Sequence, residues 1–279
     1  MPGGFPPERL RETPRIVVYL TLPMTKQTAA NRMLFYRLGI FAGTLIAVAA
    51  FVKNRHVSLR VLIMQIYFTF VQALGISAML ALGIGAAVGI IGFPFLVALG
   101  QQHLIYQLLI LIVTRDLGPL LIAFIVIARS ATAIATEVAG MVISHEVEAY
   151  ISVGVDPIEH LAVPRFLGVT VSLLLMNVYF SLFGLAGSFV IVQMFHTLPA
   201  GYYFGNLIQA LSVQDMAVVA LKSVAFGMII STVAITEGLS VERASTEVPV
   251  AGLRAVTRAF AGCIAANILL SAVYYTVMT

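Results

Sequence analysis

The sequence predicts an all-α integral membrane protein with an interfacial helix near the N-terminus, five transmembrane helices, and a short cytoplasmic helix between the second and the third. Hydrophobic residues make up 60% of the 279 residues and charged residues only 10%, so a water-soluble domain of this length could not cover its core with polar surface. Apolar runs of about 18 or more residues recur, and each is long enough to cross a bilayer core as a helix. No segment alternates in polarity as the strands of a membrane barrel do.

The N-terminal segment carries no signature of a secretory signal peptide, because residues 1–15 lack an apolar stretch and a small-residue cleavage site. We therefore expect a cytoplasmic segment over residues 1–60, followed by a membrane domain over residues 61–279. Cys263 is the single cysteine, which excludes an intramolecular disulfide and a cysteine metal cluster. Its apolar surroundings in the sequence predict a core position.

The long apolar segments define the spans. They occupy residues 34–52, 61–114, 117–143, 166–195, 216–236 and 259–278. The second has no Lys, Arg, Asp or Glu over 54 residues, and as one helix it would be about 80 Å long. We expect this helix to break at the cluster from Gly89 to Pro94, because proline lacks a backbone donor and glycine is permissive.

The distribution of Lys and Arg decides the topology. Residues 1–60 hold nine of the sixteen basic residues, the loop at 196–215 has none, and the loop at 237–258 has three arginines. If residues 61–114 carry the chain from one side of the membrane to the other, every basic cluster falls on the cytoplasmic side, as the positive-inside rule requires. The same rule predicts that 34–52 lies along the inner leaflet, which gives five crossings and an external C-terminus.

Ionisable residues within apolar segments are costly, so each one is a candidate functional residue. Arg115 and Asp116 stand where one apolar segment ends and the next begins, and Gly118-Pro119 favours a helix start there. One interpretation is a charged outer boundary of the membrane. The other is a polar contact for an amphiphile in a cavity, since an arginine fork suits a phosphate.

Arg129 and Glu137 lie eight residues apart in a segment rich in Ala, Ser and Thr, where small residues favour close helix packing. An ion pair between helices, or snorkelling towards the inner surface, accounts for both side chains. Lys222 opens the next-to-last span and Glu237 closes it, and we expect both to anchor the helix at the membrane surface.

The segment between the second and third spans predicts a short amphipathic helix on the cytoplasmic face. Ser144 can cap this helix, Val147, Tyr150 and Ile151 form an apolar stripe, and Gly154 stops it. Such a helix suits either a partner protein or the membrane surface.

Enzymatic constellations are not found. No Lys follows a glycine in a phosphate-binding loop pattern. The histidines at 145 and 160 with Glu146 are too loosely spaced to specify a metal site.

Taken together, several short motifs resemble the MlaE/YrbE permease family over roughly residues 60–278. They are Arg115-Asp-Leu-Gly-Pro119, Ala128-Arg129, Glu137, Met141, Gly-Val-Asp-Pro157, Val-Pro-Arg165, Leu221-Lys-Ser223, Gly238 and Ala-Val-Thr-Arg258. Their joint spacing carries the resemblance, because any one motif alone would be weak.

The resemblance implies a homodimeric permease of an ABC transporter in the bacterial inner membrane, with a cytoplasmic ATPase and an MCE-domain lipid-binding protein as partners and phospholipid as cargo. It also implies an elbow helix before five spans, and the Arg115-Asp116 pair matches an Arg-Glu pair beside the lipid cavity of the family. Arg129 and Glu137 are further candidates for the lipid cavity, and no cofactor is expected. The helix that couples to the ATPase would comprise Ser144, His145, Glu146, Val147, Glu148, Tyr150, Gly154, Asp156 and Pro157.

Two departures from the family pattern affect these expectations. The coupling segment usually reads Thr-Glu-Gln followed by Ile-Asp-Ala-Leu, whereas this chain places its acidic residues at 146 and 148. Asn267 replaces an aspartate that is common in the last span.

Two other functions remain open: a secondary transporter that couples through Arg129, Glu137 or Lys222, and an intramembrane lipid-modifying enzyme, for which no nucleophile and base pair is found.

Overall fold

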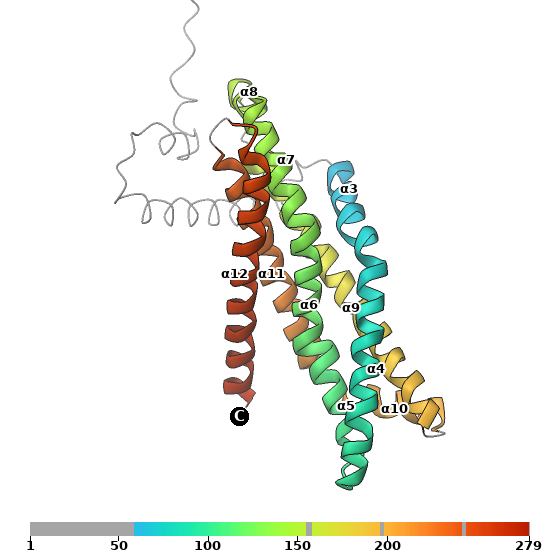
Figure 1. Cartoon of the computed structure of the whole chain (residues 1–279). Helices are drawn as coiled ribbons and strands as arrows, with labels where there is room; N and C mark the ends of the chain where they lie inside the picture. The colour runs from blue at the N-terminus through green and yellow to red at the C-terminus, as the bar shows by residue number, and fades with distance from the viewer. Residues whose placement is uncertain (1–58, 155–157, 196–197, 242–243, 279) are drawn as a thin grey trace, which may run out of the picture.

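A computed structural model describes residues 59–278 except 155–157, 196–197 and 242–243, and over this part the chain is a bundle of long helices without strands (Figure 1). Five helices are long and apolar enough to cross a membrane, which confirms the predicted fold class. They are Leu62–Ala98, Leu104–Ile143, His160–Met194, Val213–Leu239 and Glu247–Thr276. The predicted interfacial helix at 34–52 lies outside the described residues.

Each span is assembled from the following elements. The first contains α3 (Leu59–Phe70), a 3₁₀ turn at Val71–Ala73 and α4 (Leu74–Ala98). The second contains α5 (Leu104–Leu109), α6 (Leu117–Val126) and α7 (Thr132–Ile143), joined by π-helical segments at Ile110–Asp116 and Ile127–Ala131. The third is a π-helical segment at Ile158–Ala162 followed by α9 (Val163–Phe195), and the last two are α11 (Val213–Leu239) and α12 (Glu247–Met278).

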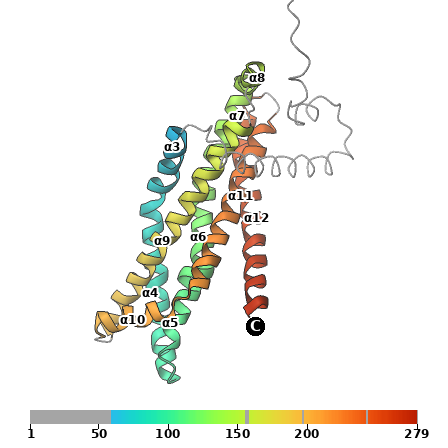
Figure 2. The same cartoon turned by 180° about the vertical axis from the view of Figure 1, so that it is seen from behind.

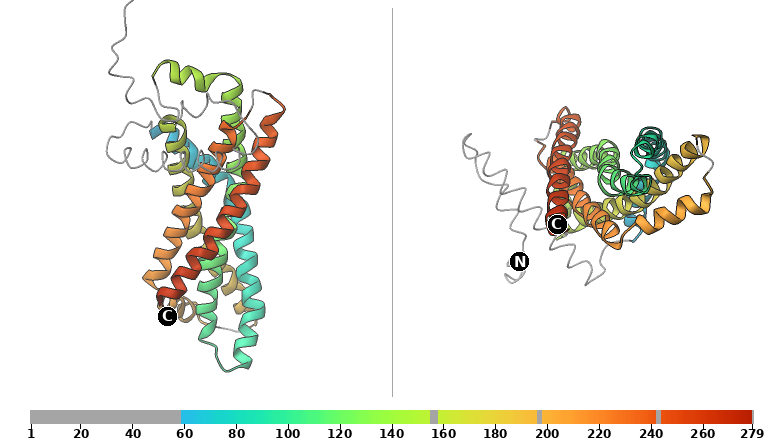
Figure 3. Two further views of the ribbon diagram at one scale, coloured as in Figure 1. Left: turned by 90° about the vertical axis from the view of Figure 1, so that its left-hand side faces the viewer. Right: turned by 90° about the horizontal axis from the view of Figure 1, so that it is seen from below.

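Two short helices mark the opposite ends of the bundle. Helix α8 (Glu146–Ser152) runs across the bundle axis at one end (Figure 3), and α10 (Ala200–Ala210) lies at the other, close to α5 (Figure 2). The C-terminal end of α12 lies at the same end as α10 (Figure 1). The start of α3 and the end of α12 therefore lie on opposite sides, as an odd number of crossings requires.

A seam of small residues packs α4 against α9. The buried residues of α4 include Ser77, Ala81, Gly85 and Gly89, which repeat every four residues and so share one face. A Cβ atom at Gly85 would lie 1.8 Å from the carbonyl oxygen of Gly184. Only glycine fits there, because any side chain would overlap the backbone of α9. Such close backbone packing is a main source of helix association in lipid.

Helix α10 was not predicted, and aromatic packing holds it against the bundle. Tyr203 is buried among the rings of Tyr106, Phe189 and Phe204, and its hydroxyl shares a hydrogen bond with Ser188. Burial raises the pKa of the Tyr203 phenol to about 12, although the bond to Ser188 acts in the opposite direction.

The position of the first turn corrects the sequence prediction. Helix α4 continues through the Gly89 to Pro94 cluster, and the turn lies at 99–103, where Gly100 has a φ of 71°. Residues 104–116 therefore belong to the second span. A proline can be tolerated inside a membrane helix because neighbouring groups satisfy the carbonyl that it leaves free.

The last two spans also begin earlier than predicted. Helix α12 starts at Glu247, so Arg254 and Arg258 lie within it and not in a loop. Cys263 is fully buried in the core, as predicted from its apolar surroundings.

Candidate functional site: a buried charge cluster

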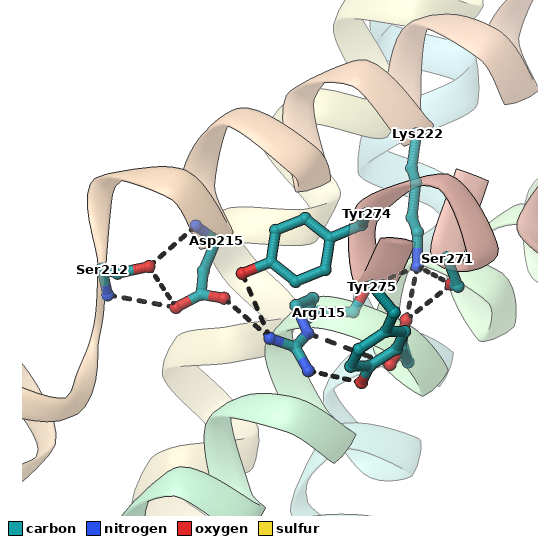
Figure 4. A network of polar contacts seen from close by, with 8 residues as sticks. Arg115, Ser212, Asp215, Lys222, Ser271, Tyr274 and Tyr275 are labelled. Atoms are coloured by element: carbon teal, nitrogen blue, oxygen red, sulfur yellow. Dashed lines mark hydrogen bonds and ion pairs between the residues drawn. The ribbon is translucent and has the colours of Figure 1, made fainter. Parts of the chain in front are cut away.

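Four charged side chains meet between the second, fourth and fifth spans, towards the end of the bundle that holds α10 (Figure 4). Arg115 and Asp116 come from the second span, and Asp215 and Lys222 come from α11. Ser271, Tyr274 and Tyr275 of α12 complete this group, which we name the charge cluster.

Lys222 is the most buried member, with a side-chain exposure of 0%. Its ammonium donates to Asp116 Oδ1 at 2.6 Å, to Ser271 Oγ at 2.9 Å and to the backbone carbonyl of Arg115 at 3.0 Å. An ammonium has three donors, so every one of them has a partner. Ser271 in turn donates to Asp116 Oδ1 at 2.9 Å.

The contact with the Arg115 carbonyl follows from the sequence of the second span. Pro119 has no N–H to give to the carbonyl four residues earlier, which is that of Arg115. The helix continues through this point as a π-helical segment, and Lys222 supplies the donor that Pro119 lacks. Pro119 lies in the first turn of α6, in agreement with the predicted helix start, and it leaves an acceptor for a cation on α11.

Arg115 is held by an acid on one side and by two phenols on the other. Its Nη1 donates to Asp215 Oδ1 at 3.2 Å and to the Tyr274 hydroxyl at 3.4 Å, and its Nη2 donates to the Tyr275 hydroxyl at 2.5 Å. The guanidinium carbon lies 4.9 Å and 5.1 Å from the centroids of the two rings, a distance that gives cation–π attraction. The Nε atom lies 3.9 Å from Asp116 Oδ2.

Asp215 serves two purposes at once. It occupies the third position of α11, where it forms a capping box with Ser212: Asp215 Oδ2 accepts from the Ser212 backbone N–H at 3.1 Å, and Ser212 Oγ accepts from the Asp215 backbone N–H at 3.1 Å. The other carboxylate oxygen faces Arg115. One side chain thus starts a helix and neutralises a buried cation.

The charge cluster balances two cations against two anions, so its formal charge is zero. Arg115 keeps 15% of its side chain exposed and Asp116 keeps 26%, so neither is completely buried. Intramembrane charges that are paired in this way mark pathways for polar cargo. A planar guanidinium suits a phosphate or carboxylate group.

The structure revises the predictions for these residues. Arg115 and Asp116 lie within the second span, which runs from Leu104 to Ile143. Lys222 does not anchor α11 at the membrane surface, since it is buried beside Asp116. Asp215, Ser271 and both tyrosines were not predicted from the sequence, and only Asp215 carried a signal, as an acid three residues after a capping serine.

Arg129 and Glu137 lie outside the charge cluster. Arg129 hydrogen-bonds to the carbonyl and the side chain of Gln72, beside the 3₁₀ turn of the first span. Glu137 accepts from Arg165 of α9 at 2.8 Å, which confirms the predicted ion pair between helices for this residue. The four residues expected to form one lipid site are therefore divided between separate places.

A second buried acid lies nearer to the α8 end. Glu237 is 2% exposed and accepts from Arg258 of α12, so its carboxylate is paired within the bundle close to the end of α11 at Leu239. This pair and the Glu137–Arg165 pair link α7, α9, α11 and α12.

Helix α8 projects from the bundle with no fully buried residue. Glu146 and Glu148 are exposed, Val147 and Tyr150 turn partly inward, and the ring of Tyr150 contacts His160. Gly154 has a φ of 79° and follows the last helical turn, as predicted for a stop signal. The remaining coupling candidates Asp156 and Pro157 lie outside the described residues.

The N-terminal cap of α8 differs from the prediction. Ser144 ends α7 and donates to the Gly140 carbonyl and to Glu146, whereas His145 occupies the capping position with a φ of 61°. The left-handed residue turns the chain sharply between α7 and α8. His145 also pairs with Glu148 at 2.7 Å.

Within the described residues, no group of three His, Cys, Asp or Glu side chains could hold a metal ion.

The fold and the charge cluster define a class: a multi-pass helical membrane protein with ion-paired charges inside its spans. Comparison with known proteins adds the family. The model of the Permease MlaE family matches residues 62–273, and the chain therefore belongs to this family of ABC transporter permeases.

Individual relatives agree with this assignment. A probable ABC transporter permease protein of Rickettsia typhi is 26% identical over 201 residues, which cover 72% of this chain and 77% of the relative. The intermembrane phospholipid transport system permease protein MlaE of Haemophilus influenzae is 23% identical, with coverage of 77% and 82%. The chloroplastic protein TRIGALACTOSYLDIACYLGLYCEROL 1 of Arabidopsis thaliana is 24% identical, with coverage of 76% and 60%.

Proposed function

We propose that this permease moves phospholipid between the bacterial inner membrane and the cell envelope, as the transmembrane subunit of an ABC transporter whose ATPase is a separate chain. The observation that carries the proposal is the division of the molecule into two functional ends. A neutral but accessible charge cluster lies inside the spans at one end, and an exposed acidic helix, α8, projects at the other. Cargo and energy source would thus act at opposite ends of the same helices.

The charge cluster is where we place the polar headgroup. A phospholipid has a phosphate that needs a cation inside the membrane and acyl chains that need none. Arg115 offers such a cation, and Arg129 offers a second one at another point along the spans. No covalent step is required, because translocation changes only the position of the lipid.

Helix α8 is where we place the ATPase. Its exposed acidic residues Glu146 and Glu148 suit a basic groove on a partner protein better than an anionic lipid surface. The sharp turn at His145 ties α8 to α7, which belongs to the same span as Arg115. A displacement of α8 by the ATPase would therefore act on the span that carries the headgroup site.

The assembly that we propose has two copies of the chain, the ATPase on the cytoplasmic side, where the N-terminus also lies, and an MCE-domain lipid-binding protein on the periplasmic side, where the C-terminus lies. The family membership supports these partners, and the name of the H. influenzae relative supports the phospholipid cargo.

Co-purification from native membranes tests the proposal. The tagged chain should bring down an ATPase, an MCE-domain protein and bound phospholipid, all detected by mass spectrometry. Reversal of charge in the double variant Glu146→Lys/Glu148→Lys should release the ATPase. Glu247→Lys, a reversal at the start of α12, is the matched control and should retain it. A chain that transports lipid without any ATPase would instead indicate a secondary transporter.

A further inference from the structure

We propose that Asp215 is a built-in competitor for the lipid phosphate: it pairs with Arg115 when no headgroup is bound, and it gives Arg115 up when a phosphate-bearing amphiphile arrives. This inference rests on the proposed function and deepens it, because it names the residue that sets how tightly the headgroup is held.

Arg115 makes only one hydrogen bond to an anion. A guanidinium has five N–H donors arranged in a fork that matches two oxygens of one anion. Asp215 takes one donor through a single carboxylate oxygen at 3.2 Å, and the other hydrogen bonds go to the neutral hydroxyls of Tyr274 and Tyr275. An anion that accepts from two donors at once would therefore bind the arginine more strongly than Asp215 does.

The charges of the charge cluster are balanced. Arg115 and Lys222 are matched by Asp116 and Asp215, so an additional phosphate brings a negative charge that must be stabilised. Binding at Arg115 becomes favourable when one carboxylate gives up its pairing with the arginine and other groups stabilise its charge. Either Asp116 or Asp215 would have to do so.

Of the two acids, only Asp215 has other groups that would stabilise its charge without Arg115. Asp116 accepts from Lys222 at 2.6 Å and from Ser271 at 2.9 Å, and Lys222 has no other acid within the charge cluster at such a distance. Asp215 Oδ2 already accepts from the Ser212 backbone N–H at 3.1 Å and from its hydroxyl at 2.7 Å. It also lies in the first turn of α11, where the helix dipole favours a negative charge.

The exchange follows from these contacts. The phosphate reaches Arg115 from the side of Tyr275, which is 44% exposed, and replaces the hydrogen bond between Nη2 and the Tyr275 hydroxyl. Asp215 remains hydrogen-bonded to Ser212 and stays ionised at the start of α11. Asp116 and Lys222 keep their pairing, so the contact between the second and fourth spans is preserved during the exchange.

Binding of defined lipids to the full-length chain tests this inference. Native mass spectrometry of the purified chain in detergent would measure the binding of phosphatidylglycerol, with diacylglycerol as the matched lipid without a phosphate. Asp215→Asn removes the competing charge and keeps an oxygen that can accept from Ser212. We expect it to bind phosphatidylglycerol about tenfold more tightly, a factor equivalent to about one charge-assisted hydrogen bond. Diacylglycerol binding should not change.

Three further variants make the result specific. Ser212→Ala weakens the cap but keeps the carboxylate, so it should not tighten phosphatidylglycerol binding. Asp215→Asn in an Arg115→Gln background should give no gain, because the arginine that the phosphate needs is absent. Asp215→Ser provides a second uncharged variant if the asparagine variant does not fold.

The outcomes separate this inference from the proposed function. If Arg115→Gln weakens phosphatidylglycerol binding but neither Asp215 variant strengthens it, the competition is refuted while the headgroup site stands. If Arg115→Gln has no effect on phosphatidylglycerol binding, the headgroup site and the competition both fall. If Ser212→Ala tightens binding as much as Asp215→Asn does, loosening of α11 and not charge competition is the cause, and the inference is overturned.

Discussion

Replacement of Lys222 by methionine should be among the most destabilising single changes in this protein. Methionine keeps the length of the side chain but removes the ammonium. The substitution takes away a donor from Asp116, from Ser271 and from the backbone carbonyl of Arg115 at the same time. The carboxylate of Asp116 then keeps its charge within the spans without its closest cation.

The magnitude follows from the burial of the two partners. Removing one member of a buried ion pair costs about 3–5 kcal/mol, because the other charge stays buried without compensation. Asp116 retains 26% exposure and the hydrogen bond from Ser271, which places the expected loss near the lower limit. We expect about 3 kcal/mol, which is about a hundredfold increase in the unfolded population.

A second substitution should reverse part of this loss. In Lys222→Met/Asp116→Asn the buried acid is neutral and no longer needs a cation, and replacement of both charges of a buried pair is often close to neutral. We expect the double variant to recover at least about half of the 3 kcal/mol. Such a recovery is the signature of direct coupling between two contacting residues.

Cys263 provides the assay. It is the single cysteine of the chain and is fully buried in α12, so a thiol reagent can reach it only when the bundle opens. The rate of labelling in detergent, measured against the rate in the unfolded chain, gives the free energy of opening for each variant. Arg254→Met, which removes a cation from the same protein outside the charge cluster, is the matched control and should change that free energy by less than about 1 kcal/mol. A loss below about 1 kcal/mol for Lys222→Met, or no recovery in the double variant, would refute the reasoning.

Three other predictions concern different parts of the bundle. Gly85→Leu should destabilise the α4–α9 seam by more than about 2 kcal/mol, because a Cβ has no room there. Gly83→Ala, with nothing within 4 Å of its Cβ, should be neutral or stabilising by up to about 1 kcal/mol. Thermal unfolding of the two variants tests this difference. Arg165→Met should cost only about 1 kcal/mol by the same labelling assay, clearly less than Lys222→Met, because its partner Glu137 is 49% exposed and can turn to water. Tyr203 has a pKa raised from 10 to about 12, so its contribution to stability is complete below pH 10 and is lost as the pH rises through 12. Tyr203→Phe should flatten that loss of stability when unfolding is measured as a function of pH. An unchanged loss in the variant would contradict the assigned burial.

The helical membrane architecture could be predicted because it follows from composition and from the length of apolar runs. The boundaries could not, because the turn at 99–103 has no Lys, Arg, Asp or Glu to mark it, whereas the charged pair Arg115-Asp116 interrupts the apolar pattern at a place where the helix continues. Pro94 predicted a break, yet it lies inside α4. The local preference of proline is overridden where another group donates to the carbonyl that the proline leaves free. Lys222 does this for the carbonyl of Arg115, four residues before Pro119.

The candidate site could be predicted only in part. Arg115 and Asp116 were found because charge in an apolar segment is conspicuous, and the same rule should have promoted Lys222 above a role at the surface. Ser271, Tyr274 and Tyr275 could not be found from one sequence, since serine and tyrosine are ordinary near the end of a membrane helix. Their relation to Arg115 depends on the packing of α12 against the second span, which no local pattern encodes.

The contact between Lys222 and the Arg115 carbonyl also has a consequence for biosynthesis. The two residues are 107 positions apart in the chain, and at about 5–20 residues per second the ribosome needs about 5–20 s to travel from one to the other. During that interval the second span exists with a proline at its centre and an acid beside it, and its lysine has not yet been made. The second span can therefore reach its final form only after the fourth has entered the membrane.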